Sequence, residues 1–86
     1  MKSIFSYQAK EELDDMSQDL QSIFIKHARK LENIPPRRHM RYSLPYYAEE
    51  VTKQARMIFD IEGQSIKIYH CFSDHKEYER WYKSYK

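Results

Sequence analysis

Arginines able to contact phosphate groups are concentrated in one short stretch of the chain. The net charge is only +2, and its excess lies entirely within Asn33–Pro45, which contains Arg37, Arg38 and Arg41 and no acidic residue. A basic connector that contains prolines and lies beside a sheet is suited to form an edge that contacts phosphates. A solubilising loop, or a loop that docks onto an acidic protein, explains the same composition equally well.

Residues able to transfer protons and stack on bases lie near the C-terminus. Histidine is the natural proton carrier near neutral pH. His75 and Lys76 fall in the first turn of a predicted helix, where a positive charge opposes the helix dipole, and this local cost points to a function. Tyr78, Trp81 and Tyr82 share one helical face. They are able to stack on bases, although packing against the sheet is the more common role of such a face.

The histidines and the single cysteine do not form a recognisable metal site. His27, His39, His70 and His75 show no ligand spacing with Cys71. We interpret His27 as a half-buried packing residue within an apolar helical stripe, and Cys71 as a small buried residue of a strand. The sequence therefore predicts neither a metal nor a cofactor.

Three runs rich in β-branched and aromatic residues must position these groups. They are Tyr46–Val51, Ala55–Ile61 and Ser65–Phe72, and the break between the last two contains Gly63, the only glycine. A glycine in a short polar break between apolar runs predicts a β-hairpin.

Alternation of apolar residues predicts the register of this hairpin. One face is expected to carry the pairs Ile61–Ile66, Phe59–Ile68 and Met57–His70, with Phe72 completing the apolar side. The other face is expected to carry Asp60–Lys67, Ile58–Tyr69 and Arg56–Cys71. The opposite charges of Asp60 and Lys67 support this register.

The remaining elements complete an α+β order. Ser3–Tyr7 is predicted as a strand. Gln8–Met16 and Ser17–Leu31 are predicted as one or two helices with a turn near Met16, and Ser73–Tyr82 as a helix capped by Ser73 or Asp74. The predicted order β-α-α-β-β-β-α indicates an antiparallel sheet with helices packed on it. Residues 1–86 are expected to form one domain.

The composition is that of a soluble cytoplasmic protein. Hydrophobic residues make up 41% of the chain and charged residues 33%, which is the balance of a folded globular domain. No apolar run is long enough to span a bilayer, and Met1–Tyr7 is too short and polar for a signal peptide. We therefore expect no membrane association.

This order of elements, with these residues, resembles the RelE/ParE superfamily of toxins from type II toxin–antitoxin pairs. The matching segments are Ala55–Ile61, which has an arginine at the start of the middle strand, Ile66–Phe72, and the short basic segment Asp74–Tyr78. The resemblance covers nearly the whole chain and implies a small RelE-like fold.

The resemblance also implies a chemistry. Ribonuclease members cleave messenger RNA without metal, typically on the ribosome, by attack of a 2′-hydroxyl on its neighbouring phosphate. Arg56 matches the arginine that stabilises the phosphate, and His75, Lys76 and Tyr78 match the terminal segment that supplies acid, charge or stacking. Where several members have basic residues in the preceding strand, this chain has two tyrosines and two glutamates, which leaves a version with Glu49 or Glu50 as base. We add Lys53 to the three connector arginines as a candidate RNA-binding residue.

The sequence is compatible with three functions. The first is an RNA-cleaving toxin with a cognate antitoxin, messenger RNA and the ribosome as partners. The second is a non-catalytic or gyrase-inhibiting member of the same fold. The third is an interaction domain that binds another protein through the basic connector and the aromatic helix.

Overall fold

The computed structural model describes residues 2–33 and 45–84. The elements follow the predicted order: β1 (Lys2–Phe5), α1 (Tyr7–Asp14), α2 (Gln18–Asn33), β2 (Tyr47–Glu50), β3 (Arg56–Glu62), β4 (Ser65–Phe72) and α3 (His75–Lys83). Within these ranges no helix is both long and apolar enough to cross a bilayer. The α+β class is confirmed.

The sheet is mixed rather than antiparallel. Its strand order is β1-β4-β3-β2, with antiparallel β2–β3 and β3–β4 pairs but a parallel pair between β1 and β4. A parallel pair requires a long crossover connection, and the chain between β1 and β4 contains α1 and α2. The prediction of an all-antiparallel sheet was therefore wrong for its first strand.

Local capping explains where the first two helices begin. The Ser6 hydroxyl accepts a hydrogen bond from Ala9 N, so the strand ends at Phe5 and Tyr7 is already helical, contrary to the predicted strand. The Ser17 hydroxyl accepts a hydrogen bond from Leu20 N in the same way and starts α2. The predicted turn near Met16 is confirmed.

The β3–β4 hairpin has the predicted register near its turn and a different one beyond a bulge. Gly63 has a φ of 59°, a left-handed conformation that glycine adopts without strain. The pairs Ile61–Ile66, Asp60–Lys67 and Phe59–Ile68 are as predicted. The next pair is Ile58–His70, which leaves Tyr69 as an extra residue, so Met57 faces Cys71 and Arg56 faces Phe72.

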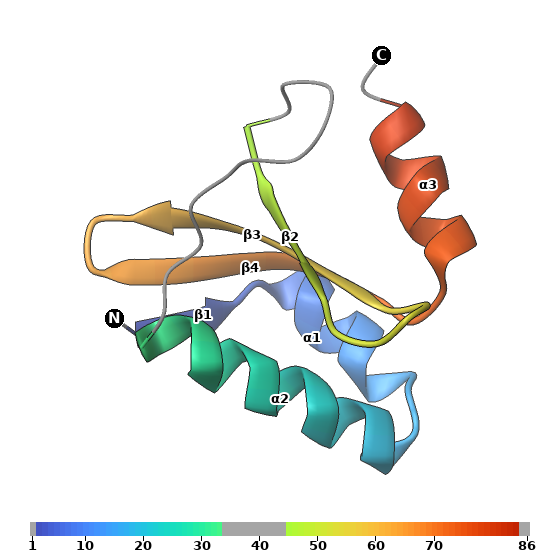
Figure 1. The fold of residues 1–86 in the computed structure, drawn as a ribbon, viewed down its shortest axis with the longest axis horizontal. Coiled ribbons are helices and arrows are strands. Elements are labelled where there is room, and N and C mark those ends of the chain that lie inside the picture. The colour runs from blue at the N-terminus through green and yellow to red at the C-terminus, as the bar shows by residue number, and fades with distance from the viewer. Residues whose placement is uncertain (1, 34–44, 85–86) are drawn as a thin grey trace.

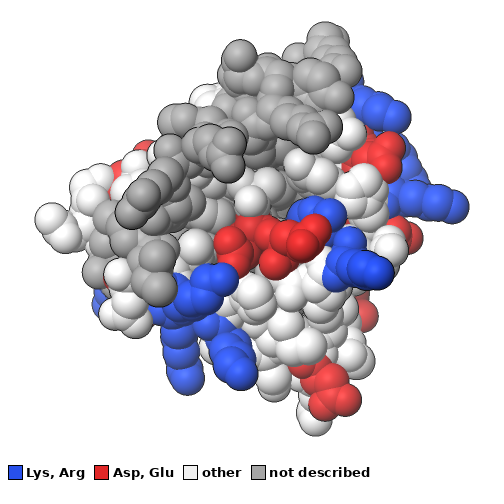
Figure 2. Space-filling model, in the orientation of Figure 1, with Lys and Arg blue, Asp and Glu red and all other residues white. Residues whose placement is uncertain are grey.

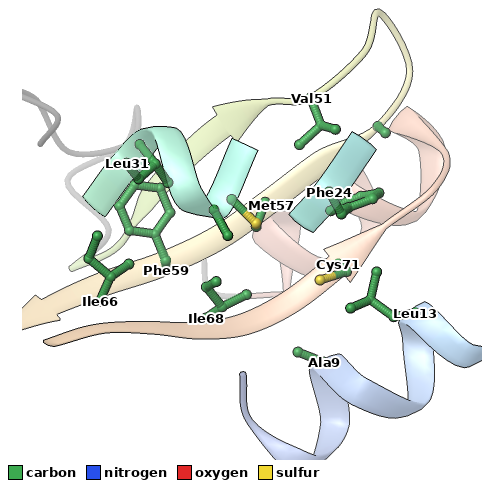
Figure 3. Close-up of a cluster of buried hydrophobic side chains, with 12 residues drawn as sticks. Ala9, Leu13, Phe24, Leu31, Val51, Met57, Phe59, Ile66, Ile68 and Cys71 are labelled. Carbon is green, nitrogen blue, oxygen red and sulfur yellow. The ribbon is translucent and has the colours of Figure 1, made fainter. Parts of the chain in front are cut away.

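Because of the bulge, the side chains at the end of β4 lie on the opposite face of the sheet from the one predicted. Cys71 enters the main core, whereas Phe72, predicted on that side, packs with Ile58 on the opposite face. Figure 3 shows the main core, in which α1 and α2 supply residues such as Leu13 and Phe24 against the inward-facing side chains of the hairpin. The helices α1 and α2 cover this face, while α3 lies against the other face beside the end of β4 (Figure 1).

Candidate functional site

The face of the sheet that carries α3 is lined by aromatic residues. Ile58 and Phe72 are buried there, and partly buried rings pack on them: Tyr46, Tyr78, Trp81 and Tyr82. We refer to these six residues as the aromatic cluster. Asp74 caps α3 by accepting a hydrogen bond from Lys76 N at 2.9 Å, which fixes the helix start directly after β4. The predicted aromatic face of this helix is confirmed for Tyr78, Trp81 and Tyr82.

Arg56 lies at the rim of this cluster and is tightly held. Its guanidinium lies 5.8 Å from the centre of the Tyr78 ring, and only 14% of its side chain is exposed. One terminal nitrogen donates to the carbonyl oxygens of Thr52, Lys53 and Ala55, each at 3.0 Å. The charge is therefore positioned both by the β2–β3 loop and by an aromatic face.

The two adjacent glutamates of β2 have different partners. Glu50 faces Arg56 across the strands and forms an ion pair with it at 3.1 Å, while its own side chain is 67% exposed. Glu49 binds His27 at 2.8 Å and Lys30 at 3.1 Å, both on α2. Figure 2 shows acidic side chains near the middle of this view with Lys and Arg on either side. Only Glu50 of the two lies beside Arg56.

His75 lies next to the same tyrosine ring. Its ring centre is 5.6 Å from that of Tyr78, and its Nδ1 is 2.7 Å from a carboxylate oxygen of Glu79. The Lys83 ammonium, hydrogen-bonded to Glu79, lowers the pKa of that carboxyl below its ordinary value, and the charge of His75 acts in the same direction. An ionised carboxylate only accepts hydrogen bonds, so Nδ1 of His75 donates a proton to Glu79 whether or not Nε2 is also protonated.

The other sequence candidates are less closely associated with this group. Lys76 is exposed on α3, and Lys53 is exposed in the β2–β3 loop, where its carbonyl oxygen binds Arg56. The connector arginines lie outside the described residues: Arg37, Arg38 and Arg41. Arg56, Glu50, Tyr78 and His75 are thus the sequence candidates that the fold brings together.

His70 is a further member of this face that sequence reasoning placed on the core side. Its ring stacks on Phe72, with centres 5.0 Å apart and an interplanar angle of 12°, and it also contacts Trp81 at 5.3 Å. Its Nδ1 lies 3.1 Å from a carboxylate oxygen of Glu12. No sequence signal marked the bulge that turns it to this face.

An acidic pocket lies behind this face. Its volume is about 240 Å³, and it is lined by Glu12, Asp15, Met16, Cys71, Ser73 and Glu77. Burial, with a contribution from the charge of Glu12, raises the pKa of the Cys71 thiol to about 12. Within the described ranges, no group of three or more His, Cys, Asp or Glu side chains is arranged to hold a metal ion. The carboxylates of the pocket make it unsuited to phosphate.

Solved structures show which known fold this is. A YoeB/ParE toxin from Agrobacterium tumefaciens superposes with a TM-score of 0.70 at 13% identity, covering 84% of this chain and 96% of the other. The YoeB dimer from Staphylococcus aureus gives 0.70 at 16% identity, with coverage of 84% and 94%. The E. coli RelBE toxin–antitoxin complex gives 0.71 at 10% identity, with coverage of 83% and 93%. The chain has the RelE/ParE toxin fold.

The sequence by itself matches no protein-family model and no curated protein sequence. The RelE/ParE fold is therefore established by the course of the backbone, and the resemblance stated from Arg56 and the segment Asp74–Tyr78 is confirmed at that level. On this fold, the four grouped candidates project from β2, β3 and α3 around one partly open aromatic surface.

Proposed function

We propose that this chain is the toxin of a toxin–antitoxin pair and that it cleaves messenger RNA without a metal, on the translating ribosome in the cytoplasm. The observation that carries the proposal is the grouping of Arg56, Tyr78 and His75 on one partly open face of a RelE/ParE fold. A fixed cation beside a proton carrier and an aromatic ring suits the cleavage of a phosphodiester.

In this proposal each residue has a distinct role. The 2′-hydroxyl of a nucleotide attacks the adjacent phosphorus, and Arg56 stabilises the negative charge that gathers on the phosphate oxygens. His75, protonated on both ring nitrogens, gives its Nε2 proton to the departing 5′-oxygen. Tyr78 supports Arg56 and offers a stacking surface, and Lys76 adds positive charge for the RNA backbone. Lys53 and the connector arginines extend this basic contact: Arg37, Arg38 and Arg41.

Glu50 is the carboxylate candidate for the base. It is bound to Arg56 at 3.1 Å, so it competes with a phosphate that binds this guanidinium. The exposed side chain of Glu50 is free to rotate towards solvent when that happens. This competition makes Glu50 a gate on the phosphate site as well as a candidate base.

A non-catalytic or gyrase-inhibiting role is the second candidate. It is favoured by the three loop carbonyls that share one nitrogen of Arg56, because such bonds give the arginine a structural role that needs no substrate. In that case, replacing Arg56 destabilises the β2–β3 loop and does not affect a catalysed reaction. The integrity of messenger RNA and of DNA after expression separates the two functions.

A cognate antitoxin is the proposed protein partner. The similar E. coli structure is a complex of RelB with RelE, and β2 is an edge strand of the described sheet. An edge strand offers unpaired backbone groups to an added strand of a partner. We propose that the antitoxin covers this edge or the adjoining aromatic cluster.

Inducible expression in a bacterial host tests the proposed function. Wild type is compared with Arg56→Ala and His75→Ala, scoring growth and the integrity of messenger RNA. Arg80→Ala is the matched control, because it removes an exposed arginine from α3. We expect growth arrest and cleaved messages with wild type and the control, and relief of both by the two site variants.

Two other results would contradict the ribonuclease. Arrest with intact messages and damaged DNA would assign the gyrase-inhibiting function. Normal growth with well-folded, well-expressed protein and intact messages would leave only a binding role. Circular dichroism of the purified variants shows whether Arg56→Ala has altered the fold.

A further inference from the structure

The β4 bulge has a specific effect on His70. Without it, alternation places His70 on the core side with Ile66 and Ile68, as the sequence predicts. With Tyr69 as the extra residue, His70 turns to the face of Arg56 and stacks on Phe72. Bulges that re-aim one side chain are common next to active sites.

Residues from the N-terminal part of the chain hold this bulge in place. Because β1 ends at Phe5, the outer edge of β4 loses its strand partner beyond Ile68. Ser6 replaces it by donating from its backbone N to Ile68 O and from its hydroxyl to Tyr69 O. Glu12 then accepts from Cys71 N at 2.7 Å with one carboxylate oxygen and contacts His70 Nδ1 at 3.1 Å with the other.

Glu12 thereby determines which nitrogen of His70 is available. An ionised carboxylate has no proton to give, so the neutral imidazole must carry its proton on Nδ1 and leave a lone pair on Nε2. Among the described residues no hydrogen bond involves Nε2 of His70. Every buried side-chain nitrogen or oxygen of the described residues has a hydrogen-bond partner. Because Nε2 of His70 has none, it is not buried and reaches solvent, consistent with the 24% exposure of the side chain.

His70 is also well placed relative to the proposed phosphate site. It faces Ile58 across the strands, and Phe72, on which it stacks, faces Arg56. The two positions differ by two residues along the strand, about 7 Å. The glutamates considered as bases are engaged by cations, Glu49 by Lys30 and Glu50 by Arg56.

We propose that His70, oriented by Glu12, is the general base of this site and works opposite His75 as the general acid. This inference rests on the proposed ribonuclease function and deepens it. Nε2 of neutral His70 takes the 2′-hydroxyl proton as the 2′-oxygen bonds to phosphorus. The bond from phosphorus to the 5′-oxygen breaks, and that oxygen takes the Nε2 proton of His75. The products are a 2′,3′-cyclic phosphate and a 5′-hydroxyl, with the two histidines left in exchanged protonation states.

Two substitutions at His70 separate catalysis from structure. His70→Asn keeps a side-chain N–H that donates to Glu12 but removes the basic nitrogen. His70→Phe keeps a ring that stacks on Phe72 and Trp81 but loses both nitrogens. The assay is single-turnover cleavage of an end-labelled messenger bound to bacterial ribosomes. Affinity is measured with the same messenger carrying 2′-deoxyribose at the cleavage site, and thermal unfolding reports on the fold.

Glu12→Gln tests the role of the carboxylate. The amide oxygen must accept from Cys71 N, so its NH₂ group faces His70 Nδ1 and donates to it. The imidazole then carries its proton on Nε2 and has no lone pair there. Nitrogen-15 NMR of the ring reports this change of tautomer directly. Glu11→Gln, at a neighbouring exposed residue of α1, is the matched control.

The expected result is a loss of cleavage of about 10²- to 10⁴-fold in both His70 variants and in Glu12→Gln, with affinity for the deoxy messenger within threefold of wild type. Cleavage within threefold of wild type in either folded His70 variant would overturn the inference. If His75→Ala abolishes cleavage in the same assay while His70→Asn does not, the ribonuclease survives and only the role of His70 fails. No cleavage by wild type would overturn both.

Discussion

The two faces of the sheet differ in what covers them and in how completely. The face under α1 and α2 is closed by aliphatic and aromatic side chains, with Met57, Phe59 and Ile68 at most 1% exposed. Of the helices in residues 2–33 and 45–84, only α3 packs on the opposite face, and it contributes no fully buried residue. The first face is a core that fixes the fold, and the second is a partly open surface where aromatic rings hold charged groups. The difference separates residues that stabilise the protein from residues available to a ligand.

The largest expected effect concerns the Cys71 thiol on the closed face. Its pKa is raised from 9.0 to about 12, so the thiolate fraction near neutral pH is about a thousandfold lower than in the unfolded chain. We expect alkylation by iodoacetamide at pH 8 to be at least this much slower in the native protein than in denaturant. Rates within tenfold of each other would show that the closed face opens readily.

The same shift has a consequence for stability at alkaline pH. Because the folded state holds this proton more tightly than the unfolded state, the thiol's contribution to stability is fully present below pH 9.0. It is lost as the pH rises from 9.0 towards about 12. Cys71→Ser should remove this alkaline component of the unfolding curve.

The next largest effect is on the free energy of unfolding, and it is expected to differ between one aromatic residue of the closed face and one of the open face. Phe59→Ala removes a side chain that is 1% exposed and should lower the free energy of unfolding by about 3–5 kcal/mol. Tyr82→Ala removes a half-buried ring of α3 and should cost less than about 2 kcal/mol. Urea unfolding followed by circular dichroism measures both.

A comparable loss in the two variants would contradict the division between the faces. It would mean that α3 belongs to the cooperative core. A protein of this size has a total stability of roughly 5–15 kcal/mol, so Phe59→Ala itself is expected to be close to the limit of folding.

An intermediate effect is expected where the two faces meet, at the bulge. Glu12→Ala leaves Cys71 N and His70 Nδ1 without their acceptor, and an unpaired buried N–H costs about 1–3 kcal/mol. The neighbouring exposed change Glu11→Ala should alter the free energy of unfolding by no more than about 0.5 kcal/mol. Equal effects at the two positions, measured in urea, would show that Glu12 does not support the bulge.

The bulge also marks the limit of what the sequence predicted. Alternation over a few residues was enough for the turn at Gly63 and the pair Asp60–Lys67, because both depend on neighbouring residues. His70 and Phe72 lie on the α3 face instead of the predicted core side because of the bulge, which is held by Ser6 and Glu12, some sixty residues away in the chain. The parallel pairing of β1 has the same non-local origin.

Only part of the candidate site was predicted from the sequence, because some of its features are local and others depend on how distant strands pair. The position of Arg56 at the start of a middle strand followed from the family resemblance, and the helix cap was placed at Ser73 or Asp74, of which the structure has Asp74. Which glutamate of β2 lies beside Arg56 depends on the β2–β3 register, which no local pattern specified. The sequence accordingly left Glu49 and Glu50 open, and the structure distinguishes them.

The smallest expected effect on stability is at Glu50, whose carboxylate pairs with Arg56 and, in the proposed function, competes with the substrate phosphate for it. Glu50→Gln removes an exposed partner of Arg56 and should change the free energy of unfolding by less than about 1 kcal/mol.

The same substitution should tighten binding of the deoxy messenger severalfold, because no carboxylate then competes with the phosphate for Arg56. Glu49→Gln, whose carboxylate binds α2 instead, should leave that affinity unchanged. Weaker RNA binding in Glu50→Gln would contradict the gate. A loss of cleavage beyond a hundredfold with affinity retained would assign the base to Glu50 and take it from His70.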